Sequence, residues 1–167
     1  MEFGLSLGSN LGDRVAHLRE ARKRIRAIEG LQVAACSSLY ETEPVGVRPE
    51  FRDRRFLNAV LAVECALLPD ALAARLHAIE AEMGRVRGED RNAPRPVDID
   101  VIYAERVQIR SETLTIPHPR WAERRFVAQP LAEIRPALVL PGVALSVEQV
   151  LRSLPYHPEV VLCRRRW

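Results

Sequence analysis

The residues that most constrain the fold are 57–66, Leu-Asn-Ala-Val-Leu-Ala-Val-Glu-Cys-Ala, because this run is almost entirely apolar. Its length and its valines fit a β-strand better than a helix. A strand with so little polar alternation is buried on much of both faces. The run therefore predicts a central strand inside a layered domain.

The rest of the chain alternates between strand and helix patterns, but several strands are separated only by loops or hairpins. Strands are predicted over 3–7, 31–40 and 97–103, the last with a hairpin partner over 107–109, and helices over 13–29, 68–83, 121–129 and 146–154. This order favours an α+β sandwich with a mostly antiparallel sheet over a doubly wound parallel fold. Two long loops are expected over 42–55 and 84–96, and one domain over residues 1–167.

The basic residues are almost all arginine, since Lys23 is the only lysine among the 25 Lys and Arg residues. A Walker-type phosphate loop needs a lysine directly after its glycine, so that class of nucleotide site is excluded.

Three cysteines lie far apart, which fits reduced thiols in a cytoplasm (Cys36, Cys65 and Cys163). No apolar run approaches the length of about 18 residues that a membrane span requires, and no secretory signal is visible. We therefore expect a cytoplasmic protein without a membrane partner.

The strongest chemical signal is Asp98-x-Asp100 within the strand predicted over 97–103. Side chains alternate along a strand, so both carboxylates lie on one face, about 7 Å apart. They repel each other there, and a hard divalent cation such as Mg²⁺ would remove that cost. A solvent-facing strand that happens to be acidic is the competing interpretation.

Four arginines precede this acidic strand within the loop predicted over 84–96: Arg85, Arg87, Arg91 and Arg95. Guanidinium groups bind phosphate oxygens at two points and stay charged near neutral pH. The loop and the aspartates together favour a polyphosphate–Mg²⁺ substrate. Alternatively, the arginines pair with nearby acidic residues on a solvated surface.

Two further segments carry weaker signals. His118 lies between Pro117 and Pro119, which restrict its backbone, so it is a candidate phosphate or ribose contact, although a lone histidine is more often structural. The segment Gly8-Ser9-Asn10-Leu11-Gly12 precedes a predicted helix and could hold an anion, but a tight turn explains it equally well. No order of residues typical of covalent catalysis is present.

With these segments in order, the chain resembles the 6-hydroxymethyl-7,8-dihydropterin pyrophosphokinase family over about residues 1–140. The resemblance is carried by residues 7–12 (LGSNLG), 39–42 (LYET), 56–60 (FLNAV), 84–87 (GRVR), 91–100 (RNAPRPVDID), 114–119 (LTIPHP) and 124–127 (RRFV). It implies a ferredoxin-like α+β fold with loops that close over the substrates. It also implies transfer of pyrophosphate from ATP to the hydroxymethyl group of the reduced pterin, with release of AMP.

The resemblance also assigns residues. Asp98 and Asp100 would hold two Mg²⁺ ions, and Arg85 and Arg95 would contact the triphosphate and stabilise developing charge. The remaining expected ATP contacts are His77, Glu80, Arg87, Arg91, Val101, Thr115, His118 and Arg124. The expected pterin contacts are Thr42, Val45, Phe56, Asn58 and Phe126, with the two phenylalanines on either face of the ring system. A monomer that acts on small molecules and binds no nucleic acid is expected.

Several positions depart from the family's usual pattern, namely Glu43, His77, Asn92, Pro96, Thr113 and Pro119.

Two alternatives to the predicted activity remain. One is another Mg²⁺-dependent phosphoryl or nucleotidyl transferase that uses the same aspartate pair. The other is an RNA-binding module of ferredoxin-like fold, suggested by the arginine-rich loop and the basic C-terminal residues 163–167, although the aromatic pattern typical of such modules is missing.

Overall fold

The apolar strand predicted from the sequence lies at the centre of the sheet. The computed structural model describes residues 1–45, 48–85 and 93–167, and within them it contains a six-stranded antiparallel sheet. The strands are β1 (Glu2–Ser9), β2 (Leu31–Cys36), β3 (Leu39–Thr42), β4 (Phe56–Cys65), β5 (Asp98–Ala104) and β8 (Val160–Arg164). Their order is β5-β1-β4-β3-β8, and β2 also pairs with β4, beyond the end of β3. The α+β prediction is confirmed.

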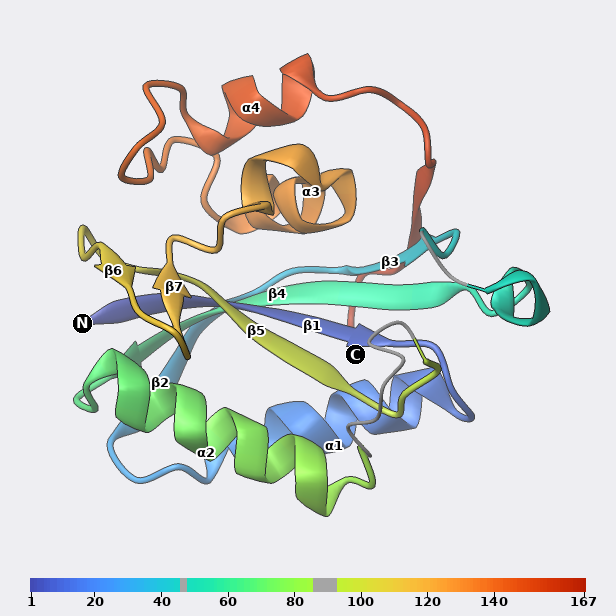
Figure 1. Cartoon of the computed structure of the whole chain (residues 1–167), viewed down its shortest axis with the longest axis horizontal. Helices are drawn as coiled ribbons and strands as arrows, with labels where there is room; N and C mark the ends of the chain where they lie inside the picture. The colour runs from blue at the N-terminus through green and yellow to red at the C-terminus, as the bar shows by residue number, and fades with distance from the viewer. Residues whose placement is uncertain (46–47, 86–92) are drawn as a thin grey trace.

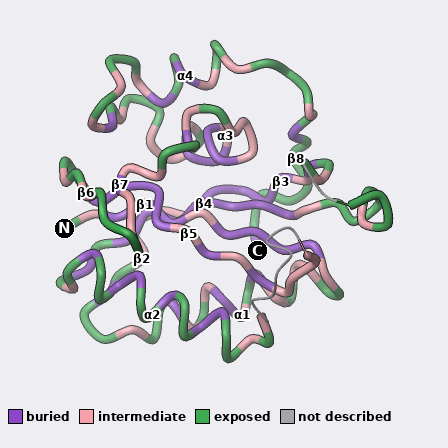
Figure 2. The backbone as a smooth tube through the Cα atoms, viewed as in Figure 1, coloured by how far each residue is buried: buried purple, intermediate pink, exposed green. Residues whose placement is uncertain are grey.

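Helices cover both faces of the sheet (Figure 1). On one face lie α1 (Arg14–Arg26) and α2 (Pro69–Glu82), and on the other α3 (Arg125–Ile134) and α4 (Val147–Ser153). The residues of β4 alternate between two cores: Leu61 packs with the core beneath α1 and α2, whereas Val60 packs with the core beneath α3 and α4. Purple buried segments therefore run through the middle of the molecule in Figure 2. This double burial explains why the strand carries so few polar residues.

The register of β1 and β5 decides which side chains can form a site. Gly8 pairs with Asp98 and Ser6 with Asp100, while their neighbours Leu7 and Ile99 belong to the core beneath α1 and α2. The polar positions therefore lie on the sheet face that carries α3 and α4. The apolar core on that face includes Val60 and Ile102, farther along the strands. The strand ends near Gly8 and Asp98 lie outside this core and line a cavity instead.

Several element boundaries differ from the prediction. The strand expected over 31–40 is broken at Ser37, whose hydroxyl accepts a hydrogen bond from the Val60 N–H at 2.9 Å and replaces a ladder carbonyl. The predicted loop over 42–55 contains a 3-10 turn at Pro49–Phe51. The helix expected over 121–129 is a 3-10 turn at Trp121–Glu123 followed by α3, and the capping box of Ser146 and Gln149 starts α4 as predicted.

Two predictions about strands were wrong or incomplete. Residues 107–109 do not form a hairpin with β5; instead β6 (Ile109–Arg110) pairs with β7 (Thr115–Ile116). Strand β8 was not predicted at all, and it extends the sheet beyond β3. None of the helices in the described ranges is long and apolar enough to cross a membrane.

Candidate active site

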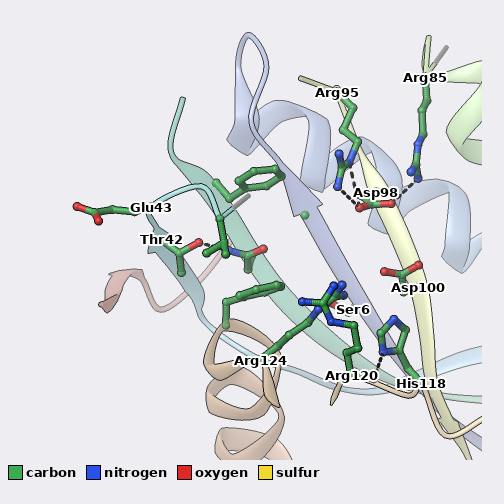
Figure 3. A pocket seen from close by; sticks show the side chains of 15 residues that line it. Ser6, Thr42, Glu43, Arg85, Arg95, Asp98, Asp100, His118, Arg120 and Arg124 are labelled. Carbon is green, nitrogen blue, oxygen red and sulfur yellow. Dashed lines mark hydrogen bonds and ion pairs between the residues drawn. The ribbon is translucent and has the colours of Figure 1, made fainter. Parts of the chain in front are cut away.

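A cavity of about 470 Å³ opens at the polar ends of β1, β4 and β5. Its wall combines carboxylates, guanidinium groups, a histidine and two aromatic rings, as the close view in Figure 3 shows for the labelled side chains. The lining residues are Ser6, Gly8, Thr42, Glu43, Val45, Phe56, Asn58, Arg85, Arg95, Asp98, Asp100, His118, Arg120, Arg124 and Phe126. Most of the predicted site residues are therefore brought together here from distant parts of the chain.

Asp98 is surrounded by two arginines that reach it from the loop before β5 (Figure 3). Arg95 donates from Nε and Nη2 to Asp98 Oδ2 at 3.0 and 2.6 Å, and Arg85 Nη1 donates to Asp98 Oδ1. Burial opposes ionisation of Asp98, but the charges of Arg95 and Arg85 outweigh it and hold its pKa below the ordinary value. The expected repulsion between the two aspartates is therefore offset at Asp98 by two cations.

Asp100 lies next along the same face and has a different environment. Among the described residues, its carboxylate has no hydrogen-bond or ion-pair partner. Burial, together with the negative charges of Asp98 and Glu80, raises the pKa of Asp100 to about 6. A half-buried carboxylate without a cationic partner is costly, and a divalent cation would relieve that cost.

Two arginines and a histidine line the cavity near Asp100. In Figure 3, Arg120 and Arg124 lie toward α3, whereas His118 lies beside Asp100 near β5. His118 Nδ1 accepts a hydrogen bond from the Arg120 N–H at 3.1 Å, while burial and the charges of Arg124 and Arg120 lower its pKa. The imidazole is therefore neutral, with its proton on Nε2 as a donor. Arg124 has no acidic partner among the described residues, so it can bind an anion.

The opposite end of the cavity is aromatic and amide-lined. Phe56 and Phe126 both line it, and the Arg95 guanidinium lies 5.4 Å from the Phe56 ring centre. Asn58 is buried and donates from Nδ2 to Thr42 Oγ1 at 2.9 Å, which leaves its Oδ1 without a partner among the described residues. Gly8 keeps this end open, because a Cβ there would come within 3.3 Å of Asn58 Oδ1. The space fits a flat, polar-edged ring.

A second cavity of about 220 Å³ adjoins the first and shares Asp100 and His118 with it. Its wall includes three further predicted residues, His77, Val101 and Thr115, together with Ala73, Leu76, Ile99, Thr113, Leu114 and Pro119. The two cavities thus share part of their walls, at Asp100 and His118. Two ligands could occupy them with their reacting ends side by side.

Of the predicted residues that the structure describes, only Glu80 lines neither cavity. Glu80 is only 1% exposed; its Oε1 accepts from the Ile99 N–H at 2.6 Å and also pairs with Arg85. This location does not support the predicted direct contact with nucleotide, because the carboxylate is engaged beneath Arg85. Arg87 and Arg91 lie outside the described residues.

Sequence analysis did not assign four residues of the main cavity. Ser6 and Gly8 follow from strand alternation once β1 is paired with β5, so their positions were in principle available from the pattern. Glu43 and Arg120 lie in irregular segments. No periodic signal could have identified them.

The donor set determines which metal the cavity could hold. Asp98 and Asp100 supply carboxylate oxygens from one strand face, and the described residues contain no group of three or more acidic, histidine or cysteine ligands. A site with two protein carboxylates suits Mg²⁺, which commonly takes its other ligands from phosphate and water. The residues therefore fit this ion when a phosphate-bearing ligand is bound.

Comparison with known proteins gives a consistent match. A family model described as 7,8-dihydro-6-hydroxymethylpterin-pyrophosphokinase (HPPK) matches residues 4–136. A protein of Methylorubrum extorquens named 2-amino-4-hydroxy-6-hydroxymethyldihydropteridine pyrophosphokinase is 44% identical over 150 residues, which is 90% of this chain and 91% of that protein. The Bacillus subtilis protein of the same name is 42% identical over 130 residues, covering 78% of this chain and 75% of that one.

Other relatives are much longer. "Folic acid synthesis protein fol1" of Pneumocystis carinii is 40% identical over 154 residues, and the match covers 92% of this chain but only 20% of that protein. A solved structure described as HPPK-DHPS in complex with substrates aligns with a TM-score of 0.67 at 14% identity, over 91% of this chain and 43% of that one. This likeness confirms the ferredoxin-like α+β fold. The present chain therefore spans a fifth to under half of these longer proteins.

Proposed function

Because the chain belongs to the 7,8-dihydro-6-hydroxymethylpterin-pyrophosphokinase family, we propose that it transfers pyrophosphate from ATP to 6-hydroxymethyl-7,8-dihydropterin. The products are AMP and the pyrophosphorylated pterin, an intermediate of folate biosynthesis. The observation that carries this assignment to named residues is the meeting of two cavities at Asp100 and His118. One cavity suits a flat pterin and the other a nucleotide base and ribose.

The reaction requires the hydroxymethyl oxygen to attack the β-phosphorus of ATP. The bond between that phosphorus and the oxygen bridging to the α-phosphate breaks, AMP departs, and the hydroxyl proton is released to solvent. Little covalent chemistry falls to the protein in such a transfer, so positioning and electrostatics supply most of the rate. This fits a cavity whose described lining residues include many charged side chains and no activated nucleophile.

The two substrates would approach Asp100 from opposite ends. The pterin lies between Phe56 and Phe126, and its polar edge meets Asn58, with Thr42 and Val45 completing the wall. The adenosine lies in the second cavity against His77, Val101 and Thr115. This arrangement places the hydroxymethyl group and the triphosphate over the same strand.

The cations of the site would bind the triphosphate. Arg124, from the α3 side, and the Nε2–H of His118, beside Asp100, can donate to phosphate oxygens. Arg85 and Arg95 are held against Asp98 and can donate as well, with Glu80 also pairing with Arg85. Preorganised guanidinium groups stabilise charge that grows on the leaving oxygen. Arg87 and Arg91 are proposed as further ATP contacts on the resemblance alone.

Asp98 and Asp100 would hold Mg²⁺ together with the phosphate oxygens, and two ions are proposed. When bound, the metal neutralises phosphate charge and polarises the transferred group. The partnerless carboxylate of Asp100 supports this role. We further propose that the chain acts as a single-domain monomer in the cytoplasm.

The test is incubation with ATP, Mg²⁺ and the reduced hydroxymethylpterin, followed by identification of both products. AMP formed in step with pyrophosphorylated pterin is expected, and Asp100→Asn should abolish it. Asp70→Asn on α2 makes the same change in charge away from both cavities and is the matched control, with normal turnover. Release of ADP or of free pyrophosphate instead would indicate a different phosphoryl or nucleotidyl transferase.

A further inference from the structure

Asn10 lies directly after β1, outside both cavities, yet it is bound to a residue that lines the larger one. Its Oδ1 accepts a hydrogen bond from the backbone N–H of Arg95 at 2.9 Å, and its own N–H donates to the Arg95 carbonyl at 3.3 Å. Asn10 is only 4% exposed. The two bonds form a clamp that holds both backbone polar groups of Arg95 against the end of β1.

This clamp is what fixes the backbone before β5. Residues 93–96 have no regular secondary structure, and their only backbone hydrogen bonds to another part of the described chain are the two to Asn10. From this anchored backbone the Arg95 side chain reaches Asp98 with two nitrogens and lies over the Phe56 ring. A displacement of the Arg95 backbone would therefore displace its guanidinium from both.

The helix that follows does not explain this use of Asn10. Helix α1 already has its N-cap in Asp13, whose Oδ1 accepts from the Ala16 N–H at 2.9 Å. Nor does the segment act as an anion cradle through Asn10, because the Asn10 N–H is already given to Arg95. Asn10 Nδ2 is buried with no hydrogen-bond partner in the described chain, so the polar contacts of this residue are those to the Arg95 backbone.

We propose that Asn10 is a positioning residue that sets the Arg95 guanidinium for pyrophosphate transfer. The proposal rests on the function proposed above, in which Arg95 contacts the triphosphate. It assigns the asparagine of the Gly8-Ser9-Asn10 turn to catalysis through Arg95 rather than to ligand binding. Its specific consequence is that Asn10 affects the rate only while Arg95 is present.

A double-mutant cycle tests this dependence by the single-turnover rate of AMP formation at saturating substrates. Arg95→Ala is expected to lower the rate about 100-fold, and Asn10→Ala about tenfold. The double variant should match Arg95→Ala within about twofold, because the clamp then has no guanidinium to position. Ser9→Ala is the matched control: Ser9 Oγ is equally buried and partnerless and does not touch Arg95, so the rate should be unchanged.

The outcomes distinguish a failure of the role of Asn10 from a failure of the proposed role of Arg95. If the double variant loses about a further tenfold beyond Arg95→Ala, Asn10 supports the fold without acting through Arg95, and the inference is overturned while the proposed function stands. If Arg95→Ala keeps the wild-type rate, the proposed role of Arg95 fails as well.

If Asn10→Ala does not fold, amide hydrogen exchange of Arg95 in the unaltered protein tests whether Asn10 holds the Arg95 backbone. Protection of about 100-fold over an unstructured peptide supports the clamp, and exchange at the unprotected rate overturns it.

Discussion

Asp98 and Asp100 are chemically identical and lie two positions apart on the same face of β5, yet the chain treats them differently. Asp98 is bound by Arg85 and Arg95, which lower its pKa, whereas Asp100 has neither and its pKa rises to about 6. The difference arises from the direction in which the arginines enter, since both come from the loop that leads directly into Asp98. The charge of Asp98 thus stabilises the folded protein, whereas the charge of Asp100 destabilises it.

This asymmetry predicts opposite stability effects for two asparagine variants of the metal-free protein. Because the pKa of Asp100 is raised in the folded state, the folded protein binds more protons than the unfolded chain between about pH 4 and 6, and its free energy of unfolding falls as pH rises through that window. Asp100→Asn removes the penalty and should stabilise the protein by up to about 3 kcal/mol near pH 8, with no gain near pH 4.

Asp98→Asn should have the opposite effect, because it removes the carboxylate charge that Arg85 and Arg95 both contact. A loss of about 3 kcal/mol near pH 8 is expected, diminishing as pH falls through the lowered pKa of Asp98. Urea denaturation in the presence of a chelator at both pH values measures these changes. Equal effects of the two substitutions would contradict the asymmetry.

Gly8 sets the depth of the aromatic end of the cavity. A Cβ at this position would come 3.3 Å from Asn58 Oδ1 and 3.7 Å from the Phe56 ring. Gly8→Ala should therefore raise the KM for the pterin by about tenfold or more, the cost of one extra methyl group in a tight site. The KM for ATP serves as the internal control and should stay near its wild-type value. An equal rise in both constants would show that the pterin does not bind there.

At the scale of elements, the C-terminal residues complete the sheet on the side away from β5. Strand β8 pairs with β3, and Trp167 at the end of the chain is only 7% exposed. The Trp167 indole donates to the Ser37 carbonyl at 2.8 Å, and the Arg22 guanidinium stacks 4.5 Å from its ring centre. The tryptophan thus covers the break between β2 and β3, from which β3 continues to Thr42 and the cavity.

Trp167→Ala should destabilise the protein by about 3 kcal/mol through lost burial. Trp167→Phe keeps an aromatic ring and loses the hydrogen bond, so it should recover most of that stability. Thermal unfolding measures both, and the single-turnover rate should change little in either variant, because Trp167 lines neither described cavity. An unfolding temperature unchanged by Trp167→Ala would contradict the buried position of this side chain.

For the whole molecule, sequence periodicity predicted the fold class because the strongest patterns, such as residues 57–66, belong to elements whose burial dominates their structure. It failed where pairing is decided by distant residues. Strand β8 carries exposed side chains and has no alternation of its own, and the break at Ser37 depends on Val60 across the sheet. Local patterns carry no information about such partners.

The candidate site shows the same division. Strand alternation was enough to place Asp98 and Asp100 on one face, and the family resemblance supplied residues that line the two described cavities. Neither revealed that Arg85 and Arg95 contact Asp98 but not Asp100, nor that Glu80 also pairs with Arg85. Those contacts depend on how the loop before β5 folds back, which the sequence pattern does not specify.

The pairing of Gly8 with Asp98 and of Ser6 with Asp100 also favours the correct register of β5 during folding. A slip of β5 by one residue would turn both acids into the hydrocarbon interior beneath α1 and α2 and expose Ile99 instead. Misaligned chains would therefore be unstable as well as inactive. The two aspartates proposed to act in the reaction therefore also destabilise any shifted register of β5, because that register would bury their charges.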